Sequence, residues 1–342
     1  MRGVRIQKLE GTDAFIVFDL DTAPRSVGVT RVAPKILVDG ATALARTNTY
    51  LFALFQQQIG GASAGINAKP DDRSAAIDAF VAEVSPLVEA GAFVPDAGKG
   101  IGENELASLR AHDPRAADLR EAAPSLLATG VAVATDTALG GLADRTVAID
   151  GIDAGTGPII DALAARGARV VALSGAKGTV RNAGGFDAAT VVAALAEHGA
   201  AGVEQLGGEV EPANGIYATE ADALLSGSKV GAIDHDVAAG LTAKVVVPTA
   251  PVPVTAKALA ALRRRGTVVL PDFITIAGPQ FAMFAEDGAT VDMVDAEVAH
   301  NVRGALELVL EHEDGPVLGA CYLAEDFLRT WQETLPFGRP LA

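Results

Sequence analysis

The sequence predicts an α/β protein of two domains, the C-terminal one built on a Rossmann-type, doubly wound parallel sheet. The chain has 342 residues, which is long for a single core, and 49% of them are hydrophobic. From Arg145 onward, short apolar segments alternate with helical patterns, as expected for parallel strands joined by crossover helices. The part before Arg145 mixes strands and helices without this alternation, so we expect a separate α/β domain there.

In the N-terminal part, the apolar segments 14–20 and 26–32 predict two strands. Apolar residues then recur at helical spacing over 40–58 and again over 75–90, which predicts two helices. A short strand at 92–94 leads into the turn sequence Pro-Asp-Ala-Gly.

In the C-terminal part, a long helix over 125–139 ends at a pair of glycines and precedes the alternating region. Two helices at 290–312 and 320–333 close the chain. The strands and helices expected between them are the strands 147–150, 170–173, 223–225, 244–247 and 267–270, and the helices 158–166 and 188–197.

Composition excludes several classes of function. A net charge of −16 argues against nucleic acid and anionic membranes as partners, because both select basic surfaces. Cys321 is the single cysteine, so no intrachain disulfide can form. His235 is isolated from other ligand-type residues, and we expect no metal site. The chain opens without a basic segment leading into an apolar run, and no apolar stretch approaches the roughly 18 residues of a membrane span. We therefore expect a cytoplasmic protein.

Five segments carry a family pattern in order and at fitting spacing. They read TAPRSVGVTRVAP (22–34), LARTNTYLFALFQQQIGGASAGI (44–66), PDAG (95–98), ATG (128–130) and PDFITIAG (271–278). Together they resemble the glutamate/leucine/phenylalanine/valine dehydrogenase family, and the pattern is most similar to leucine dehydrogenases. The resemblance covers nearly the whole chain.

The resemblance implies a domain for substrate binding and oligomerisation at 1–135, to which 313–342 returns. It also implies a dinucleotide-binding domain at 142–292, an interdomain helix at 293–312, and a substrate cleft between the domains. The implied activity is oxidative deamination of an amino acid, or the reverse, with NAD or NADP. Because family members assemble through the N-terminal domain, we expect at least a homodimer, formed where the strand around 27–30 would otherwise be an open edge.

Two family lysines are replaced in this chain. The lysine that holds the substrate carboxylate falls at Leu51. The lysine that acts as general base falls at Ser63, after the expected glycine turn of Gly60 and Gly61. Leucine cannot pair with a carboxylate, and serine has no pKa near neutrality. The family's proton-shuttling aspartate is retained as Asp96.

The nearest new cation to this aspartate is Lys99, three residues further along the chain. Lys99 has two interpretations, as a displaced carboxylate anchor or base and as a solvated loop lysine. Asp96 likewise suits both a catalytic role and a turn-forming role.

The dinucleotide fingerprint is also altered. Gly151, Asp153, Ala154 and Gly155 occupy the turn between strand and helix where Gly-x-Gly-x-x-Gly belongs, so an aspartate replaces the second glycine. Asp153 would repel a pyrophosphate, and we expect it to cap the following helix instead. Starting the loop at Gly155-Thr156-Gly157 would keep a phosphate-binding turn, so this register stays open.

Further cofactor positions differ as well. Ser174 or Gly175 stands where the ribose-binding acid is expected, and Ser174 with Lys177 suits the 2′-phosphate of NADP. Ile276 replaces the asparagine that the family carries in the loop at 271–278. We group Ile276 with Gly60, Gly61, Ser63 and Leu51 as substrate-side positions. Thr129 keeps the family residue on the cofactor side.

These replacements leave two interpretations. The first is a divergent oxidoreductase acting on a small amino-acid-like or keto-acid-like substrate with NAD(P). The second is a family member that has lost dehydrogenation and serves another small-molecule reaction, ligand binding or a partner role. In both, weak or absent dinucleotide binding is expected.

Overall fold

The computed structural model describes residues 3–341, which divide into two compact units. The first consists of residues up to 116 together with 321–341, and the second spans 117–320. Each unit contains one sheet, of five strands in the first and six in the second. The sequence-based boundaries after residue 135 and at 142–292 stay predictions for the functional domains.

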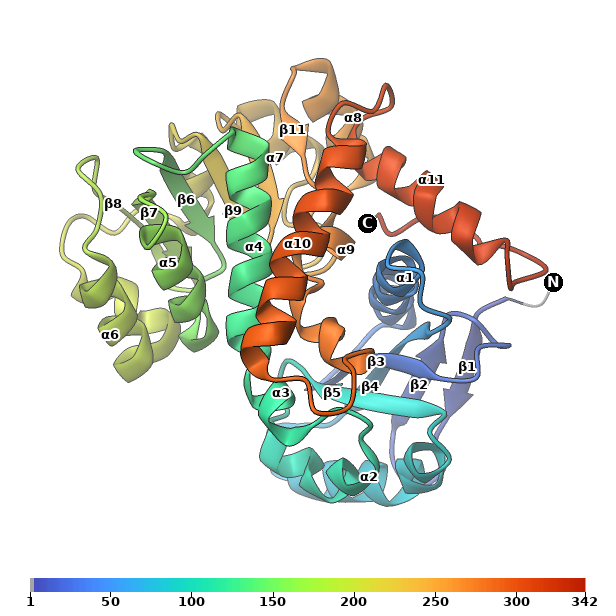
Figure 1. The fold of residues 1–342 in the computed structure, drawn as a ribbon. Coiled ribbons are helices and arrows are strands. Elements are labelled where there is room, and N and C mark those ends of the chain that lie inside the picture. Colours follow the sequence, from blue (N-terminus) through green and yellow to red (C-terminus); the bar gives the residue numbers. More distant parts are fainter. Residues whose placement is uncertain (1–2, 342) are drawn as a thin grey trace. The chain divides into compact units, whose positions relative to one another are not determined.

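The first unit is a five-stranded sheet of order β1-β2-β4-β3-β5 with a helix on each face (Figure 1). One face packs on α2 through Ile77, Phe80 and Val84, and the other meets α1 through Ala41 and Ala45. The elements are β1 Arg5–Lys8, β2 Ala14–Phe18, β3 Ser26–Ala33, α1 Val38–Leu54, β4 Gly60–Asn67, the 3-10 helix η1 Pro70–Asp72, α2 Arg73–Glu89, β5 Phe93–Ala97 and η2 Glu103–His112.

Two expectations for this sheet are wrong. The glycine segment after α1 is not a turn, because Gly60 and Gly61 open strand β4. Strand β3 is not an open edge, because it pairs in parallel with β4 on one side and with β5 on the other. The unrecognised strand β4 is the physical reason for both differences, since it provides the neighbour that β3 was expected to lack.

Buried polar contacts fix α1 within the first unit. The guanidinium of Arg46 donates from Nε to both carboxylate oxygens of Asp19 at 2.7 and 2.8 Å, and from Nη1 to the carbonyls of Phe337 and Gly338. One turn further along, the Tyr50 hydroxyl donates to Glu325 at 3.1 Å. Burial and the Glu325 carboxylate raise the pKa of Tyr50 well above its usual range. The C-terminal segment is therefore tied to α1 by charge-assisted hydrogen bonds.

The second unit is a six-stranded sheet of order β11-β10-β9-β6-β7-β8, parallel except for β8. Right-handed crossovers run from β6 to β7 and from β9 to β10 in opposite directions, which places their helices on opposite faces. This confirms the predicted Rossmann-type fold. The strands are β6 Thr146–Asp150, β7 Arg169–Gly175, β8 Gly178–Arg181, β9 Ala223–Ser226, β10 Val245–Pro248 and β11 Val268–Val269.

The helices of the second unit follow the predicted periodicity. In α10, Val294, Val298, Val302 and Leu306 are buried at intervals of one turn, which makes one face apolar. The helices are α3 Ala117–Glu121, α4 Ala123–Leu139, α5 Gly157–Ala164, α6 Ala188–His198, α7 His235–Gly240, α8 Ala256–Arg264, α9 Asp272–Thr275 and α10 Val291–Val309, with the 3-10 helices η3 Ala154–Thr156, η4 Gly199–Gln205, η5 Ala213–Ala218 and η6 Gly278–Met283. The last helix, α11 Pro316–Leu328, begins in the second unit and belongs to the first unit from Cys321 onward.

Candidate functional site

Two predicted substrate-side residues lie in one row across the first sheet. Val29 of β3 is paired with Asp96 of β5, and the Ser63 hydroxyl of β4 donates to the Val29 carbonyl at 3.4 Å. Ser63 is fully buried, whereas Asp96 is partly exposed. The fold therefore brings Ser63 and Asp96 onto neighbouring strands with Val29 between them.

Helix α1 packs directly on the start of β4. The Gly61 amide donates to Thr49 Oγ1 at 2.9 Å, and a Cβ at Gly61 would lie 1.8 Å from the Ala45 carbonyl oxygen. Only glycine fits there, so this residue is explained by packing. Leu51 follows Thr49 by two residues in α1 and is 1% exposed. It offers a ligand no polar group, and a lysine at this position would be buried in the core.

Asp96 does not stand alone. Its Oδ1 lies 2.6 Å from Nη1 of Arg115, a residue that the sequence reasoning missed. Arg115 also donates from Nε and Nη2 to the two carboxylate oxygens of Asp113 at 2.9 and 2.8 Å. Burial disfavours the charge on Arg115, but the two carboxylates outweigh it and raise its pKa. Asp96 thus faces a guanidinium that stays positively charged at physiological pH.

The structure does not join Lys99 to Asp96. Lys99 follows β5 in a loop whose backbone extends the sheet, because its carbonyl accepts from the Val32 amide at 2.9 Å. Its side chain is exposed and has no hydrogen bond or ion pair within residues 3–341. The solvated interpretation of this lysine fits these observations better than the catalytic one.

In the second unit, the turn after β6 holds the altered fingerprint. Gly151 has a φ of +89°, and a Cβ there would lie 2.3 Å from the Ser228 amide nitrogen. Asp153 caps η3, which contains Ala154 and Gly155. Its Oδ1 accepts from the Gly155 amide at 2.8 Å and from the Thr156 hydroxyl at 3.2 Å. Asp153 thus caps the 3-10 helix that precedes α5, whereas the N-cap of α5 itself is Thr156 without a side-chain bond. The Asp153 carboxylate engages an amide of the turn where a phosphate would bind.

A buried carboxylate that the sequence reasoning overlooked stands just before this turn. Asp150 is 5% exposed, and its Oδ2 accepts from the hydroxyls of Ser228 at 2.7 Å and of Ser226 and Tyr217 at 3.1 Å. Burial and this carboxylate raise the pKa of Tyr217. Asp150 and Asp153 therefore give the turn two carboxylates, which is unfavourable for a pyrophosphate.

Ser174 is the penultimate residue of β7 and lies beside the same turn. Its carbonyl accepts from the amides of Gly151 and Ile152 at 2.9 and 3.0 Å, and its hydroxyl donates to the Ala213 carbonyl at 3.0 Å. The side chain is 1% exposed. The Ser174 hydroxyl therefore donates to the protein itself and not to a ligand. Lys177 lies exposed in the turn that follows β7.

The other two predicted residues of this unit lie in helical segments. The Thr129 hydroxyl on α4 donates to Asp295 on α10 at 2.5 Å. Ile276 ends the short helix α9 and is partly buried. Helix α4 passes close to this helix, because a Cβ at Gly130 would lie 2.9 Å from the Thr275 carbonyl oxygen. Thr129 and Ile276 are thus on neighbouring segments of the second unit.

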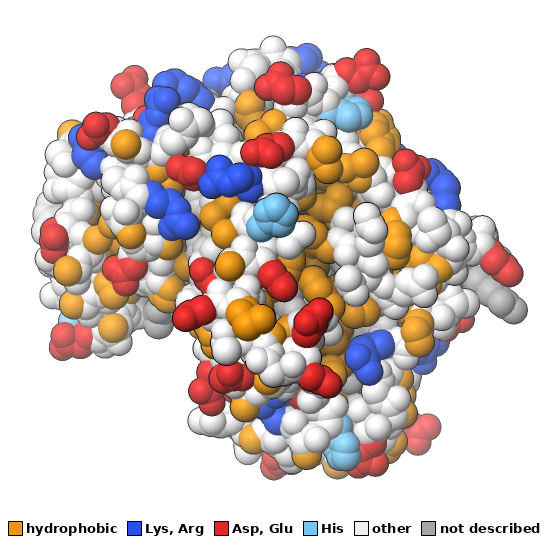
Figure 2. Space-filling view, viewed as in Figure 1, with side chains coloured by type: hydrophobic (Ala, Val, Ile, Leu, Met, Phe, Trp, Pro, Cys, Tyr) orange, Lys and Arg blue, Asp and Glu red, His pale blue; other side chains and the backbone are white. Residues whose placement is uncertain are grey.

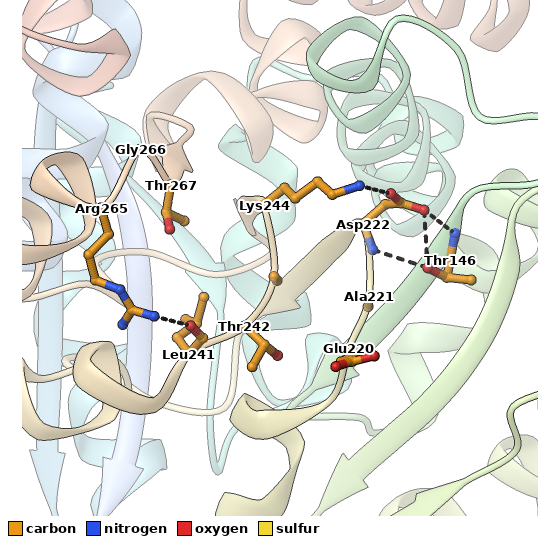
Figure 3. Close-up of a pocket in the computed structure, with 11 residues that line it drawn as sticks. Thr146, Glu220, Ala221, Asp222, Leu241, Thr242, Lys244, Arg265, Gly266 and Thr267 are labelled. Atoms are coloured by element: carbon orange, nitrogen blue, oxygen red, sulfur yellow. Dashed lines mark hydrogen bonds and ion pairs between the residues drawn. The ribbon is translucent and has the colours of Figure 1, made fainter.

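A groove of about 760 Å³ lies at the amino-terminal ends of the parallel strands of the second sheet (Figure 3). Asp222 accepts from Lys244 Nζ at 2.9 Å and from the amide and hydroxyl of Thr146 at 3.0 and 3.1 Å. Lys244 and the Thr146 backbone lower the pKa of Asp222 to about 2. Ligands of doubly wound sheets bind at the carboxyl ends of the strands, so we assign this groove a structural role.

The surface and the remaining chemistry add three observations. Figure 2 shows acidic side chains lying between the basic ones on the visible face. Within residues 3–341, no group of three or more His, Cys, Asp or Glu side chains is placed to hold a metal ion. Among the helices described, none is both long and apolar enough to cross a bilayer.

The two-unit fold and the order of the family segments are those of the amino-acid dehydrogenase family, and comparison with known families agrees. The family model described as Glutamate/Leucine/Phenylalanine/Valine dehydrogenase matches residues 121–313. Because this match covers more than half of the chain, the chain belongs to that family.

Among curated relatives, the NADP-specific glutamate dehydrogenase A1 of Halobacterium salinarum is 27% identical over 336 residues, covering 87% of this chain and 79% of that protein. Among solved structures, the hetero-hexameric glutamate dehydrogenase of Thermus thermophilus in its leucine-bound form has a TM-score of 0.77 at 20% identity, covering 97% of this chain and 90% of its own. The L-tryptophan dehydrogenase of Nostoc punctiforme has a TM-score of 0.63 at 19% identity, covering 97% of this chain and 96% of its own. These likenesses establish the shared fold, whereas a particular closeness to leucine dehydrogenases is not seen.

Proposed function

We propose that this member of the family binds a small amino-acid-like or keto-acid-like molecule and has lost the lysine-dependent oxidative deamination of its relatives. The observation that carries this proposal is the environment of Ser63, at the position of the family's general base. Ser63 is fully buried on β4, and its hydroxyl donates to the Val29 carbonyl. A serine held in this way has no basic group with a pKa near neutrality.

The carboxylate anchor is lost in the same way. Leu51 is buried in α1 and presents only methyl groups to its surroundings. Asp96 remains, but Arg115 holds one of its oxygens at 2.6 Å. A substrate would therefore meet neither lysine and an aspartate already engaged with a cation. Deamination needs all three groups to act together, so we propose that the reaction is absent rather than slowed.

The dinucleotide contacts do not fit NAD(P) in this structure. The exposed Asp153 accepts from the Gly155 amide, Asp150 adds a carboxylate that is buried, and the Ser174 hydroxyl donates to a backbone carbonyl. Each lost or opposed contact weakens binding by roughly 1–3 kcal/mol. We therefore assign no chemical step to a nicotinamide.

A divergent NADP-dependent dehydrogenase is the second candidate. It is supported by the retained Asp96 and Thr129, by the exposed Lys177 beside Ser174, and by the NADP specificity in the name of the Halobacterium salinarum relative. Self-association into a dimer or larger homo-oligomer accompanies both candidates, and sedimentation at micromolar concentration tests it.

The experiment that separates the candidates combines binding with turnover. The purified chain is titrated calorimetrically with L-leucine, L-glutamate and 4-methyl-2-oxopentanoate, and each amino acid is then incubated with NAD or NADP. The proposal expects binding of at least one acid and no formation of reduced nicotinamide. Turnover that disappears in Asp96→Asn would instead establish the second candidate.

A further inference from the structure

The face of the first sheet that carries Ser63 and Asp96 also carries an arginine with two donor atoms that find no acceptor among the described residues. Arg31 lies on β3 two residues beyond Val29, so strand alternation puts both side chains on one face. Its partner on β4 is Gly65, and a Cβ at Gly98 would lie 3.2 Å from Arg31 Cγ. The row that follows Ser63–Val29–Asp96 is therefore one arginine flanked by two glycines.

The guanidinium of Arg31 is buried along one edge. Within residues 3–341, its Nε and Nη2 atoms are buried and have no hydrogen-bond partner. Burial lowers the pKa of Arg31, although a guanidinium stays charged at physiological pH. Two buried donors on a cation are unfavourable when nothing accepts from them, and proteins rarely keep such an arrangement without a use.

The chemistry of that edge selects its ligand. Nε and Nη2 of a guanidinium point in parallel and match the two oxygens of a carboxylate side by side. The other charged groups of this face are already engaged, because Arg115 pairs with Asp96 and Asp113. Lys99 is exposed in its loop. Arg31 is thus the cation of this face whose charge is not compensated within the described residues.

We propose that Arg31 is the anchor of this chain for the carboxylate of its ligand, bound side-on through Nε and Nη2. This inference rests on the proposed function, namely that the first unit binds an amino-acid-like or keto-acid-like molecule. It adds that the ligand carries a free carboxylate and that a different strand, β3 rather than helix α1, holds it. The neighbouring positions 65 and 98 are glycines, and Phe15 Cζ and Ile36 Cγ2 lie 2.8 and 2.9 Å from where a Cβ at Gly65 would be.

Arg31→Met tests this proposal with two readouts. Thermal stabilisation by acetate, pyruvate, 4-methyl-2-oxopentanoate and L-leucine is measured for both proteins, with L-leucinamide as the probe that lacks a carboxylate. The loss of charged hydrogen bonds should weaken carboxylate binding roughly tenfold to hundredfold. Arg31→Lys keeps the charge without the side-on edge and should give intermediate affinity. Lys35→Met, which removes an exposed cation from the loop after β3, is the matched control and should bind as the wild type does.

The second readout is stability without ligand. An arginine kept for folding would lose stability when replaced, whereas removal of an unpartnered buried charge leaves Tm unchanged or raises it. Unchanged or higher Tm with weaker carboxylate binding supports the proposal. Three results would overturn it. The wild type and Arg31→Met could bind carboxylates equally well, L-leucine and L-leucinamide could stabilise the protein equally, or none of the four acids could stabilise it. These outcomes are independent of nicotinamide turnover, which decides the proposed function separately.

Discussion

The turn after β6 makes a quantitative prediction about dinucleotide affinity. Asp153 has two effects on a phosphate, because its charge opposes the ligand and its Oδ1 engages the Gly155 amide at 2.8 Å. Like charges about 4 Å apart repel by about 1 kcal/mol in water and about 4 kcal/mol at an effective dielectric of 20. Asp153→Gly removes both effects, and we expect NADPH to bind at least about fivefold more tightly, since 1.4 kcal/mol is a factor of ten. The loss of the cap to glycine should cost only a few tenths of a kcal/mol of stability.

Asp153→Asn separates the two effects, because asparagine is an equally good cap but carries no charge. Calorimetric titration with NADPH measures all three proteins, and urea unfolding measures their stability. A gain in both variants assigns the effect to charge, and a gain in glycine alone assigns it to the occupied amide. Tight NADPH binding by the unmodified chain, or no gain in either variant, would refute the reasoning from this turn.

Three further predictions concern packing and charge. Leu51→Lys should lower the free energy of unfolding in urea by about 3 kcal/mol or more, because it buries an unpaired ammonium. Leu51→Met should lower it by less than about 1.5 kcal/mol. Equal losses of stability in the two variants would mean that position 51 is not enclosed. Gly61→Ala should cost roughly 1–3 kcal/mol because its Cβ would lie 1.8 Å from the Ala45 oxygen, while Gly40→Ala, with open space in the same helix region, should be neutral or stabilising; a harmless Gly61→Ala would contradict the packing of α1 on β4. The carboxylate of Asp222 has a pKa lowered to about 2, so its contribution to stability is complete above its unfolded-state pKa of about 3.9 and is lost as the pH falls through 2. The difference in unfolding free energy between the wild type and Asp222→Asn should therefore shrink as the pH falls through that window. A difference that stays constant would show that the ion pair with Lys244 contributes nothing.

Periodicity predicted most of the fold, because long elements carry many repeats of the pattern. The helix α10 follows from regularly spaced valines and leucines, and the strands β6, β9 and β10 follow from short continuous apolar runs. Strand β4 was missed because its sequence GGASAGIN has no large side chain on the face that packs against α1. Its glycines are there because the helix backbone approaches the strand, a tertiary reason that no local pattern contains.

The candidate site was predictable where the family pattern reaches it. Leu51, Ser63, Asp96 and Asp153 were found by position, and the cap made by Asp153 followed from elementary helix chemistry. Arg115 was missed because its importance depends on the carboxylates that face it in space. Arg31 was missed because the absence of an acceptor for its Nε and Nη2 among the described residues is a three-dimensional property. A single arginine within the apolar strand segment VGVTRVA was the available signal for Arg31.

Incubation of the chain with L-amino acids and NADP decides whether oxidative deamination has been lost. We expect that no amino acid yields reduced nicotinamide above the rate without protein, while calorimetry detects binding of an amino or keto acid that weakens in Arg31→Met. Reduction of NADP by an amino acid, abolished by Asp96→Asn and retained in Arg31→Met, would contradict it.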